Sequence, residues 1–250
     1  MENNTGEYIK KLQKNWDELG KRDPFWSVVS HPDKKNGRWE IKEFFDIGVK
    51  EIQGIFNYLS SKLNIQPGKE RALDFGCGVG RITQALTAYF DEVCGVDISS
   101  SMIELAKKHN LHGERCKYYL NVNDNLKIFP NDNFDFIYSN ITLQHMKPEY
   151  VMNYLKEFIR LLRPDGLLVF QMASERVKTF KSVISRFIPK LLLNFYRVSK
   201  HKQGSLIEMH GIKRDEMISF LEENKAKIID IKQSPSSGKE WISYQYFVKK

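Results

Sequence analysis

A glycine-rich segment, residues 73–82, combines residue types and spacing that suit the binding of a small ligand. It reads Leu73-Asp74-Phe75-Gly76-Cys77-Gly78-Val79-Gly80-Arg81-Ile82. It follows an apolar run typical of a strand and precedes a helical pattern, a context in which glycines let the backbone bend tightly and approach a ligand. Asp97 ends the next apolar run, where a carboxylate can accept two hydrogen bonds from ribose hydroxyls. Together these features predict a site for a nucleoside-containing ligand.

The spacing of the glycines distinguishes between classes of nucleoside cofactor. The dinucleotide fingerprint GxGxxG would need its third glycine at position 81, but that position is arginine. The glycines stand instead at 76, 78 and 80, preceded by Asp74. Arginine at position 81 therefore argues against a dinucleotide-dependent dehydrogenase, which ranks behind the two other functions considered below.

This pattern resembles the first motif of class I S-adenosylmethionine-dependent methyltransferases, and the resemblance extends from about Gln66 to the end of the sequence. Residues 93–99 resemble the family's second motif, and residues 134–145 and 162–166 resemble its fourth-strand and fifth-strand motifs. The resemblance implies S-adenosylmethionine as cofactor, with the glycine loop around its methionine part and Asp97 on its ribose. It places Ile98 and Met102 beside adenine, and either Asn123 or Asp124 on the adenine amino group. The implied cofactor-binding residues are Asp74, Gly76, Cys77, Gly78, Gly80, Asp97, Ile98, Met102, Asn123, Asp124 and Ser139.

His145 is the candidate catalytic residue. Methyl transfer from a sulfonium depends largely on proximity and alignment, but a hydroxyl acceptor benefits from a general base, whereas a neutral amine needs only positioning. His145 closes the segment Ser139-Asn140-Ile141-Thr142-Leu143-Gln144-His145, just beyond the fourth predicted strand, where open α/β sheets bind their ligands. A histidine that only packs or orders this loop is the alternative interpretation.

Other residues are candidates for binding the methyl acceptor. Asn140 follows Asp135 at the spacing of the NPPY motif of amino-group methyltransferases, but both prolines and the aromatic residue are absent. Methylation of nucleic acid is therefore not expected. Three of the four tryptophans, Trp16, Trp26 and Trp39, lie in the N-terminal stretch and form either a lid over the cofactor or the core of a helical cap. The substrate-binding candidates are Asn140, His145, Arg186, Arg197, His210 and Trp241.

The elements that must position these residues alternate between strands and helices, which is typical of a parallel sheet with crossover helices. We expect strands at about 71–75, 93–97, 117–120, 134–139 and 166–172, and helices at about 80–89, 100–109, 149–162 and 213–224. A turn at 234–238 joins the apolar run 228–231 to a last strand at 241–248, so these two strands must be antiparallel. The predicted fold is α/β and Rossmann-like: a seven-stranded, mostly parallel sheet with an antiparallel C-terminal strand and helices on both faces. We predict an N-terminal helical cap at 1–66 and a methyltransferase domain at 67–250, with a basic helical insertion after the fifth strand at about 175–210.

The charge of the chain is concentrated in this insertion. The 250 residues carry a formal net charge of +8, and residues 176–202 contain eight lysines and arginines with no acidic residue. The segment is interpreted as a solvated cap, as a lid that recognises an acidic substrate such as a phosphorylated sugar, or as a peripheral membrane or partner contact. No apolar run approaches the roughly 18 residues of a membrane-spanning helix, and the polar N-terminus lacks the apolar core of a secretory signal. We expect a cytoplasmic protein.

The sequence thus predicts an S-adenosylmethionine-dependent methyltransferase of a small-molecule or glycan-like acceptor, acting at oxygen. The acceptor is expected to be anionic if the basic insertion forms part of its pocket. Methylation at nitrogen is the alternative, and a noncatalytic cofactor-binding module that serves a partner protein is the rival of a different class. Neither a metal site nor a disulfide is expected, because Cys77, Cys94 and Cys116 are odd in number and lack CxxC spacing.

Overall fold

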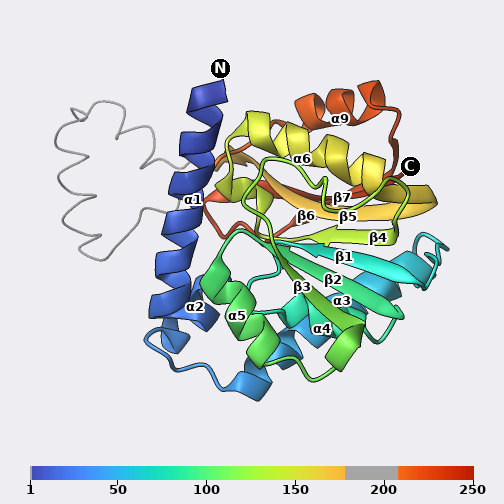
Figure 1. Cartoon of the computed structure of the whole chain (residues 1–250). Helices are drawn as coiled ribbons and strands as arrows, with labels where there is room; N and C mark the ends of the chain where they lie inside the picture. The colour runs from blue at the N-terminus through green and yellow to red at the C-terminus, as the bar shows by residue number, and fades with distance from the viewer. Residues whose placement is uncertain (1, 178–207) are drawn as a thin grey trace.

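The computed structural model describes residues 2–177 and 208–250. These residues form a seven-stranded sheet in the order β3-β2-β1-β4-β5-β7-β6 (Figure 1). Neighbouring strands are parallel from β3 to β5, and β7 is antiparallel to both β5 and β6. The predicted fold class is therefore confirmed. The strands are β1 (Arg71–Phe75), β2 (Glu92–Asp97), β3 (Cys116–Leu120), β4 (Phe134–Ser139), β5 (Leu162–Arg176), β6 (Lys227–Ser234) and β7 (Trp241–Lys249).

Helices cover both faces of the sheet, as predicted. On one face α3 (Ile41–Ser61) and α4 (Arg81–Leu86) bury apolar residues against the inner strands. On the opposite face α6 (Pro148–Leu161) and α9 (Arg214–Glu223) contribute to the largest apolar cluster. The remaining helices are α1 (Glu2–Arg22), α2 (Pro24–Val28) and α5 (Ser100–Lys108), with short 3-10 turns η1 (Pro32–Lys34), η2 (Gly113–Arg115) and η3 (Leu143–His145). None of the helices among the described residues is long and apolar enough to cross a membrane.

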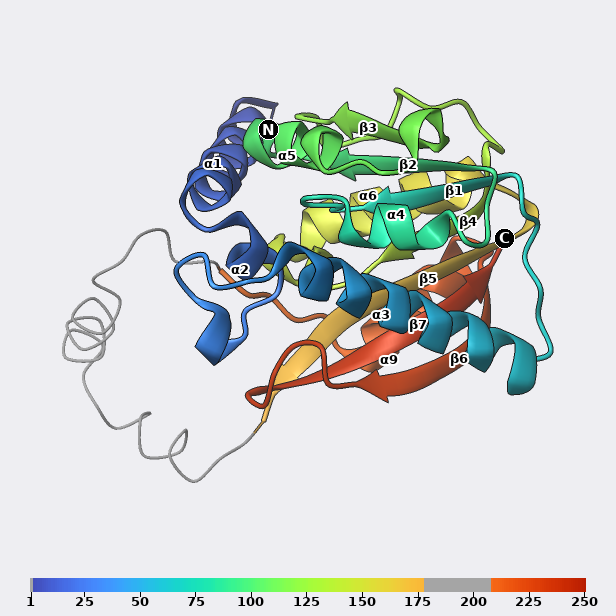
Figure 2. The ribbon, with the colours of Figure 1, turned by 90° about the horizontal axis from the view of Figure 1, so that it is seen from below.

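The N-terminal stretch is helical, as predicted, and α3 packs directly on the sheet. Ile52, Ile55 and Leu59 of α3 belong to the same buried cluster as Phe136 of β4 and Phe247 of β7. Figure 2 shows α3 running along this face of the sheet, while α1 stands across the strand ends in Figure 1. The division into a cap at 1–66 and a domain at 67–250 stays a prediction.

Two elements differ in length from the prediction. The strand expected at 166–172 extends over Leu162–Arg176, because Leu162 already pairs with Phe134 and Arg176 still pairs with Trp241. The helix expected at 80–89 ends at Leu86. Its last turn tightens, since the N–H groups of Thr87, Ala88 and Tyr89 donate to the carbonyls three residues earlier.

Described residues on both sides of the segment 178–207 are held to the carboxyl end of β5 and its neighbours. Val177 N donates to Glu240 O at 2.9 Å, and Ile212 N donates to Ala173 O at 3.0 Å. His210 N donates to Gln144 O at 2.8 Å. Most of the helical insertion predicted at about 175–210, including Arg186 and Arg197, lies outside the described residues, and its predicted first residues, Glu175 and Arg176, belong to β5.

Candidate active site

The glycine turn after β1 brings three segments close together. Gly76 has a φ of 78°, and a Cβ there would lie 2.2 Å from Thr142 Oγ1 in the loop after β4. Gly78 has a φ of 52°, and a Cβ there would lie 2.8 Å from a methyl group of Val28 in α2. A positive φ and such close neighbours exclude residues with a side chain. Glycine at both positions therefore lets the turn form and lets the loop after β4 and α2 approach it.

Asp97 ties this turn to the end of β2. Its carboxylate accepts hydrogen bonds from Gly78 N at 2.8 Å and from Ser99 N at 2.9 Å. Burial raises the pKa of Asp97, although these backbone hydrogen bonds act to lower it. The acid predicted at the strand end is thus held in a fixed orientation.

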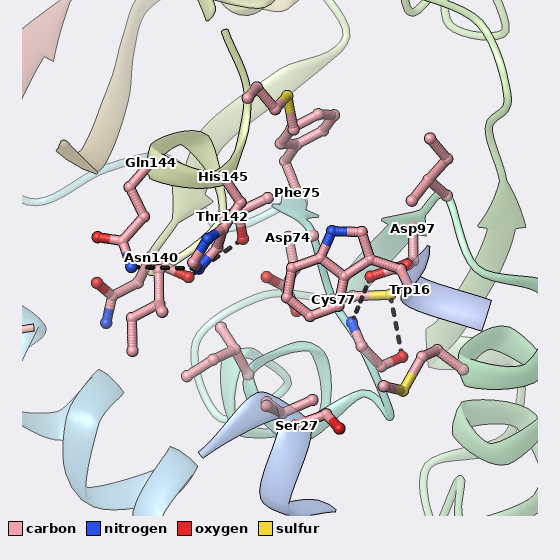
Figure 3. Close-up of a pocket in the computed structure, with 18 of the residues that line it drawn as sticks. Trp16, Ser27, Asp74, Phe75, Cys77, Asp97, Asn140, Thr142, Gln144 and His145 are labelled. Atoms are coloured by element: carbon pink, nitrogen blue, oxygen red, sulfur yellow. Dashed lines mark hydrogen bonds between the residues drawn. The ribbon is translucent and has the colours of Figure 1, made fainter. Parts of the chain in front are cut away.

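A cavity of about 560 Å³ opens beside the turn. The carboxyl ends of β1 and β2, the loop after β4, the β6–β7 turn and the helices α1 and α2 surround it. Figure 3 shows the indole of Trp16 between Asp97 and His145. The predicted site residues that line the cavity are Asp74, Gly76, Cys77, Gly78, Asp97, Ile98, Met102, Asn140 and His145.

Six further predicted site residues do not contribute to the lining. Gly80 precedes α4 with a φ of 83° and faces Tyr118, while the Ser139 hydroxyl donates to Phe75 O at 3.0 Å. Trp241 begins β7, where Arg176 lies 5.2 Å from its ring centroid. The other three are Asn123, Asp124 and His210.

Asn121 lines the cavity where Asn123 and Asp124 were predicted. Its side-chain Nδ2 donates to Asn123 O at 3.3 Å and to Asn125 O at 2.9 Å. These bonds fix the amide and leave its buried Oδ1 without a hydrogen-bond partner. Leu120 ends β3, so Asn121 is the first residue of the loop and is 4% exposed.

Asp74 is a second carboxylate on the cavity wall, and it is buried. Its Oδ2 accepts a hydrogen bond from Thr83 Oγ1 at 2.7 Å. Burial raises the pKa of Asp74 to about 7, even though this hydrogen bond and the nearby Arg81 act to lower it. Near neutral pH this carboxyl group is therefore present in both protonation states.

Glu51 of α3 binds three residues around the cavity and was not singled out in the sequence. One carboxylate oxygen accepts from Arg81 at 2.8 Å. The other accepts from the Tyr138 hydroxyl at 2.8 Å and from Asn140 Nδ2 at 2.7 Å. An acidic residue on an amphipathic helix is ordinarily exposed, so the sequence alone carried no signal for this role.

His145 is neutral and held from both sides of its ring. Its Nδ1 lies 3.1 Å from Glu208 O, and its Nε2 lies 3.3 Å from Gln144 Nε2. The Trp16 ring packs edge-on at a centroid distance of 5.4 Å. Burial lowers the pKa of His145 to about 4.

The three N-terminal tryptophans lie in different surroundings, and one of them lines the cavity. Trp16 lines the cavity, whereas Trp39 is buried beside Phe44 and donates from Nε1 to Val29 O at 3.2 Å. Trp26 donates to His31 O at 2.9 Å. Thus only Trp16 of the three has the position expected of a lid residue.

Asp17, next to Trp16, joins α1 to the start of α5. Its carboxylate accepts from Ser101 N at 3.0 Å, from Ser99 Oγ at 2.9 Å and from Ser100 Oγ at 3.2 Å. Partial burial acts to raise the pKa of Asp17, but these hydrogen bonds outweigh it and lower the pKa to about 2.

A buried polar cluster on the far wall was also missed. Gln144, Gln171 and Ser237 bond to one another behind His145. A glutamine inside the apolar run of β5 is the signal that could have indicated it, because a fully buried amide needs partners. Among the described residues, no group of three or more His, Cys, Asp or Glu side chains could hold a metal ion.

Comparison with known proteins finds a family match over part of the chain. Residues 73–170 match the family described as "Methyltransferase domain". Phosphoethanolamine N-methyltransferase 1 from Arabidopsis thaliana is 29% identical over 144 residues, which cover 57% of this chain and 28% of the relative. Ubiquinone biosynthesis O-methyltransferase from Pasteurella multocida is 25% identical over 203 residues, covering 75% of this chain and 78% of the relative. The chain spans only 20% to 28% of the length of plant phosphoethanolamine N-methyltransferases from Arabidopsis thaliana, Triticum aestivum and Zea mays.

Solved structures share the fold. Magnesium protoporphyrin IX methyltransferase from Synechocystis, with bound SAH, aligns with a TM-score of 0.63 at 15% identity, covering 97% of this chain and 99% of that chain. The 1,6-didemethyltoxoflavin-N1-methyltransferase from Burkholderia thailandensis aligns with a TM-score of 0.61 at 16% identity, covering 98% and 90%. The predicted fold is confirmed by these similarities.

Proposed function

We propose that this chain, which carries a class I S-adenosylmethionine-dependent methyltransferase domain, methylates a small molecule at a hydroxyl oxygen in the cavity beside Asp97 and His145. The observation that carries the proposal is the neutral imidazole of His145 on the cavity wall that the glycine turn and Asp97 also line. When bound, S-adenosylmethionine supplies an electrophilic methyl group.

The cofactor side of the cavity has the groups that a nucleoside requires. Asp97 would accept the ribose hydroxyls through oxygen lone pairs that its two backbone bonds leave free. The orphaned Oδ1 of Asn121 is a buried acceptor that suits the amino group of adenine. Ile98 and Met102 give this part of the cavity apolar walls, and the glycine turn would receive the methionine part.

The acceptor side offers uncharged polar groups and apolar surface. Asn140, Thr142 and Ser237 lie on this wall, together with Met146 and Ile141. Among the described lining residues, Arg81 is the only lysine or arginine, and Glu51 pairs with it. The described walls therefore favour an acceptor that is uncharged where it receives the methyl group; an anionic or glycan-like acceptor stays a prediction from the sequence.

His145 would take the acceptor's proton at Nε2. Glu208 O can only accept a hydrogen bond, so Nδ1 carries the ring proton and Nε2 carries the lone pair. An imidazole with a pKa of about 4 is a weak base. An oxygen that has gained a methyl group is, however, a far stronger acid than imidazolium, so proton transfer to His145 remains downhill.

Methylation at nitrogen is the second candidate. The plant relatives named above are N-methyltransferases, which favours it. An amine needs no base at the moment of transfer, so the two reactions differ in their dependence on His145.

The test combines cofactor binding with turnover. We expect Asp97→Ala to weaken S-adenosylhomocysteine binding by about 1.5–3 kcal/mol in calorimetry, the range for hydrogen bonds to a charged group. Asp124→Ala, outside the cavity, is the control and should bind normally.

With any acceptor found by screening hydroxyl and amine compounds, His145→Ala should lower kcat by about 10²–10⁴-fold while cofactor affinity is retained. A loss below about threefold would exclude His145 as the base and favour an amine acceptor.

A further inference from the structure

The side chains behind His145 form a series of hydrogen bonds in which each donor and acceptor is fixed. The series begins at the backbone N–H of Ile141 and ends at the backbone carbonyl of Glu208. Ile141 N donates to Gln171 Oε1 at 3.1 Å, which fixes the amide of Gln171. Its Nε2 must then donate, to Ser237 Oγ at 2.7 Å and to Gln144 Oε1 at 3.2 Å. Gln171 is fully buried and Gln144 is 2% exposed, so water does not compete for these groups.

The amide of Gln144 is fixed in turn. Its Oε1 accepts from Ser237 Oγ at 2.6 Å as well as from Gln171. The Nε2 of Gln144 therefore faces His145 Nε2 at 3.3 Å. Because an amide nitrogen only donates, His145 Nε2 has to accept. On the other side of the ring Glu208 O can only accept, so His145 Nδ1 carries the proton and donates to it.

We propose that Gln144 is the positioning residue for His145, holding the imidazole as the Nδ1–H tautomer with its Nε2 lone pair on the cavity wall. The inference rests on the proposed function in one respect, namely that this lone pair receives the acceptor's proton. The Gln144–His145 contact of 3.3 Å is longer than the usual 2.9–3.0 Å of an N–H bond. An acceptor hydroxyl can therefore replace it at Nε2.

The same arrangement disfavours a proton on Nε2 in the resting protein. A protonated Nε2 would face the NH₂ group of Gln144, and turning that amide would set its NH₂ against the NH₂ of Gln171. Charged groups near the ring come from α1 and from the residues after position 207. The Glu208 carboxylate lies 3.5 Å from Lys11 Nζ and 3.6 Å from His210 Nε2. In the described part of the chain, no carboxylate is bonded to either ring nitrogen.

The substitution Gln144→Glu tests the inference. It keeps the shape of the side chain but replaces the Nε2 donor that faces His145 with an oxygen that can only accept. One carboxylate oxygen can still accept from Ser237 and Gln171. The other now faces His145 Nε2 and can only accept, which favours a proton there. We expect the titration midpoint of His145 to rise by two or more pH units, a change of at least 100-fold in proton affinity. Nitrogen NMR of histidine-labelled protein measures it, with the His145 signals assigned from their loss in His145→Ala.

The wild-type protein supplies a measurement that needs no variant at Gln144. Between pH 6 and 8 its His145 signals should show a protonated Nδ1 and an unprotonated Nε2. Gln53→Glu, which adds the same charge on the exposed side of α3, is the matched control and should leave the midpoint unchanged. An Nε2–H tautomer in the wild type, or an unmoved midpoint in folded Gln144→Glu, would overturn the inference.

Turnover separates this inference from the proposed function. If His145 is the base, Gln144→Glu should lower kcat at neutral pH and recover activity as the pH rises past the new midpoint, with S-adenosylhomocysteine affinity unchanged. Should the NMR midpoint move as expected while kcat shows no such pH dependence, the positioning by Gln144 stands and the assignment of His145 as base is wrong.

Discussion

Two carboxylates on the same cavity wall, buried Asp74 and half-buried Asp97, differ in what stabilises their charge. Asp97 accepts two backbone N–H bonds, whereas Asp74 accepts one hydroxyl bond. A carboxylate that receives more hydrogen bonds keeps its charge more readily when buried. Asp97 is therefore the better permanent anion, and Asp74 is the group whose charge responds to pH near neutrality.

This difference predicts how stability depends on pH. The native state holds a proton on Asp74 up to about pH 7, while an unfolded aspartate releases it near the ordinary value of about 3.9. The native state thus binds more protons in this window, and the contribution of Asp74 to stability falls as the pH rises from about 4 to 7. Asp74→Asn cannot ionise and should lose less stability than the wild type between pH 5 and 8, by a few kcal/mol. Urea unfolding of both proteins at pH 5 and pH 8 gives the two free energies of unfolding. An equal loss of stability in the wild type and in Asp74→Asn would contradict the prediction.

At the scale of elements, α1 is held over the cavity through the start of α5. Asp17 caps α5 from outside by bonding Ser99, Ser100 and Ser101, and Ser99 N also bonds Asp97. Gly20 allows the close approach, since a Cβ there would lie 2.4 Å from Ser101 Oγ. The helix that carries Trp16 is thus connected to the carboxylate at the end of β2.

Loss of this cap should loosen α1. We expect Asp17→Ala to destabilise the protein by about 1 kcal/mol, as removal of a helix cap does, and to expose α1 to limited proteolysis. Because the pKa of Asp17 is lowered to about 2, its contribution is complete above about pH 4 and is lost as the pH falls toward 2. Glu18→Ala, one residue along the same helix, is the control. Equal cleavage rates for the two variants would show that Asp17 does not hold α1.

Local pattern and tertiary contact explain what the sequence could and could not predict about these elements. The strands were predictable because they are short apolar runs, as expected of parallel strands that helices cover on both faces. The extension of β5 was not, because Glu175 and Arg176 are polar and join the sheet only by pairing with β7. Whether Asn121, Asn123 or Asp124 reaches the cavity depends on the residue at which β3 ends, and polar residues so close together in the sequence carry no signal for that.

At the scale of the whole molecule, Glu51 connects the N-terminal stretch to the sheet. It joins α3 to the starts of α4 and of the loop after β4 through Arg81 and Asn140. Arg81 is 5% exposed, so its buried positive charge is compensated by this partner rather than by water. The N-terminal helices and the sheet should therefore unfold together.

Removal of the carboxylate tests this coupling. We expect Glu51→Ala to destabilise the protein by about 3–5 kcal/mol, because it leaves a buried guanidinium uncompensated. Asp46→Ala, which removes an exposed pair with Lys42 on the same helix, should cost no more than about 0.5 kcal/mol. Tryptophan fluorescence follows mainly the N-terminal stretch and circular dichroism follows the whole chain. Separate transitions by these two probes in the wild type would show that the two parts unfold independently.

The bonds that border the segment 178–207 also bear on how such a chain can change over evolution. Because Ala173 and Ile212 are directly bonded, and Val177 is fixed to Glu240, β5 keeps its register whatever length of chain joins these points. Closing a longer or shorter loop between neighbouring ends changes the free energy by only about 0.6 kcal/mol for each doubling of length. Insertion, deletion or exchange of sequence at this position can therefore occur while the paired strands of the described residues stay as they are.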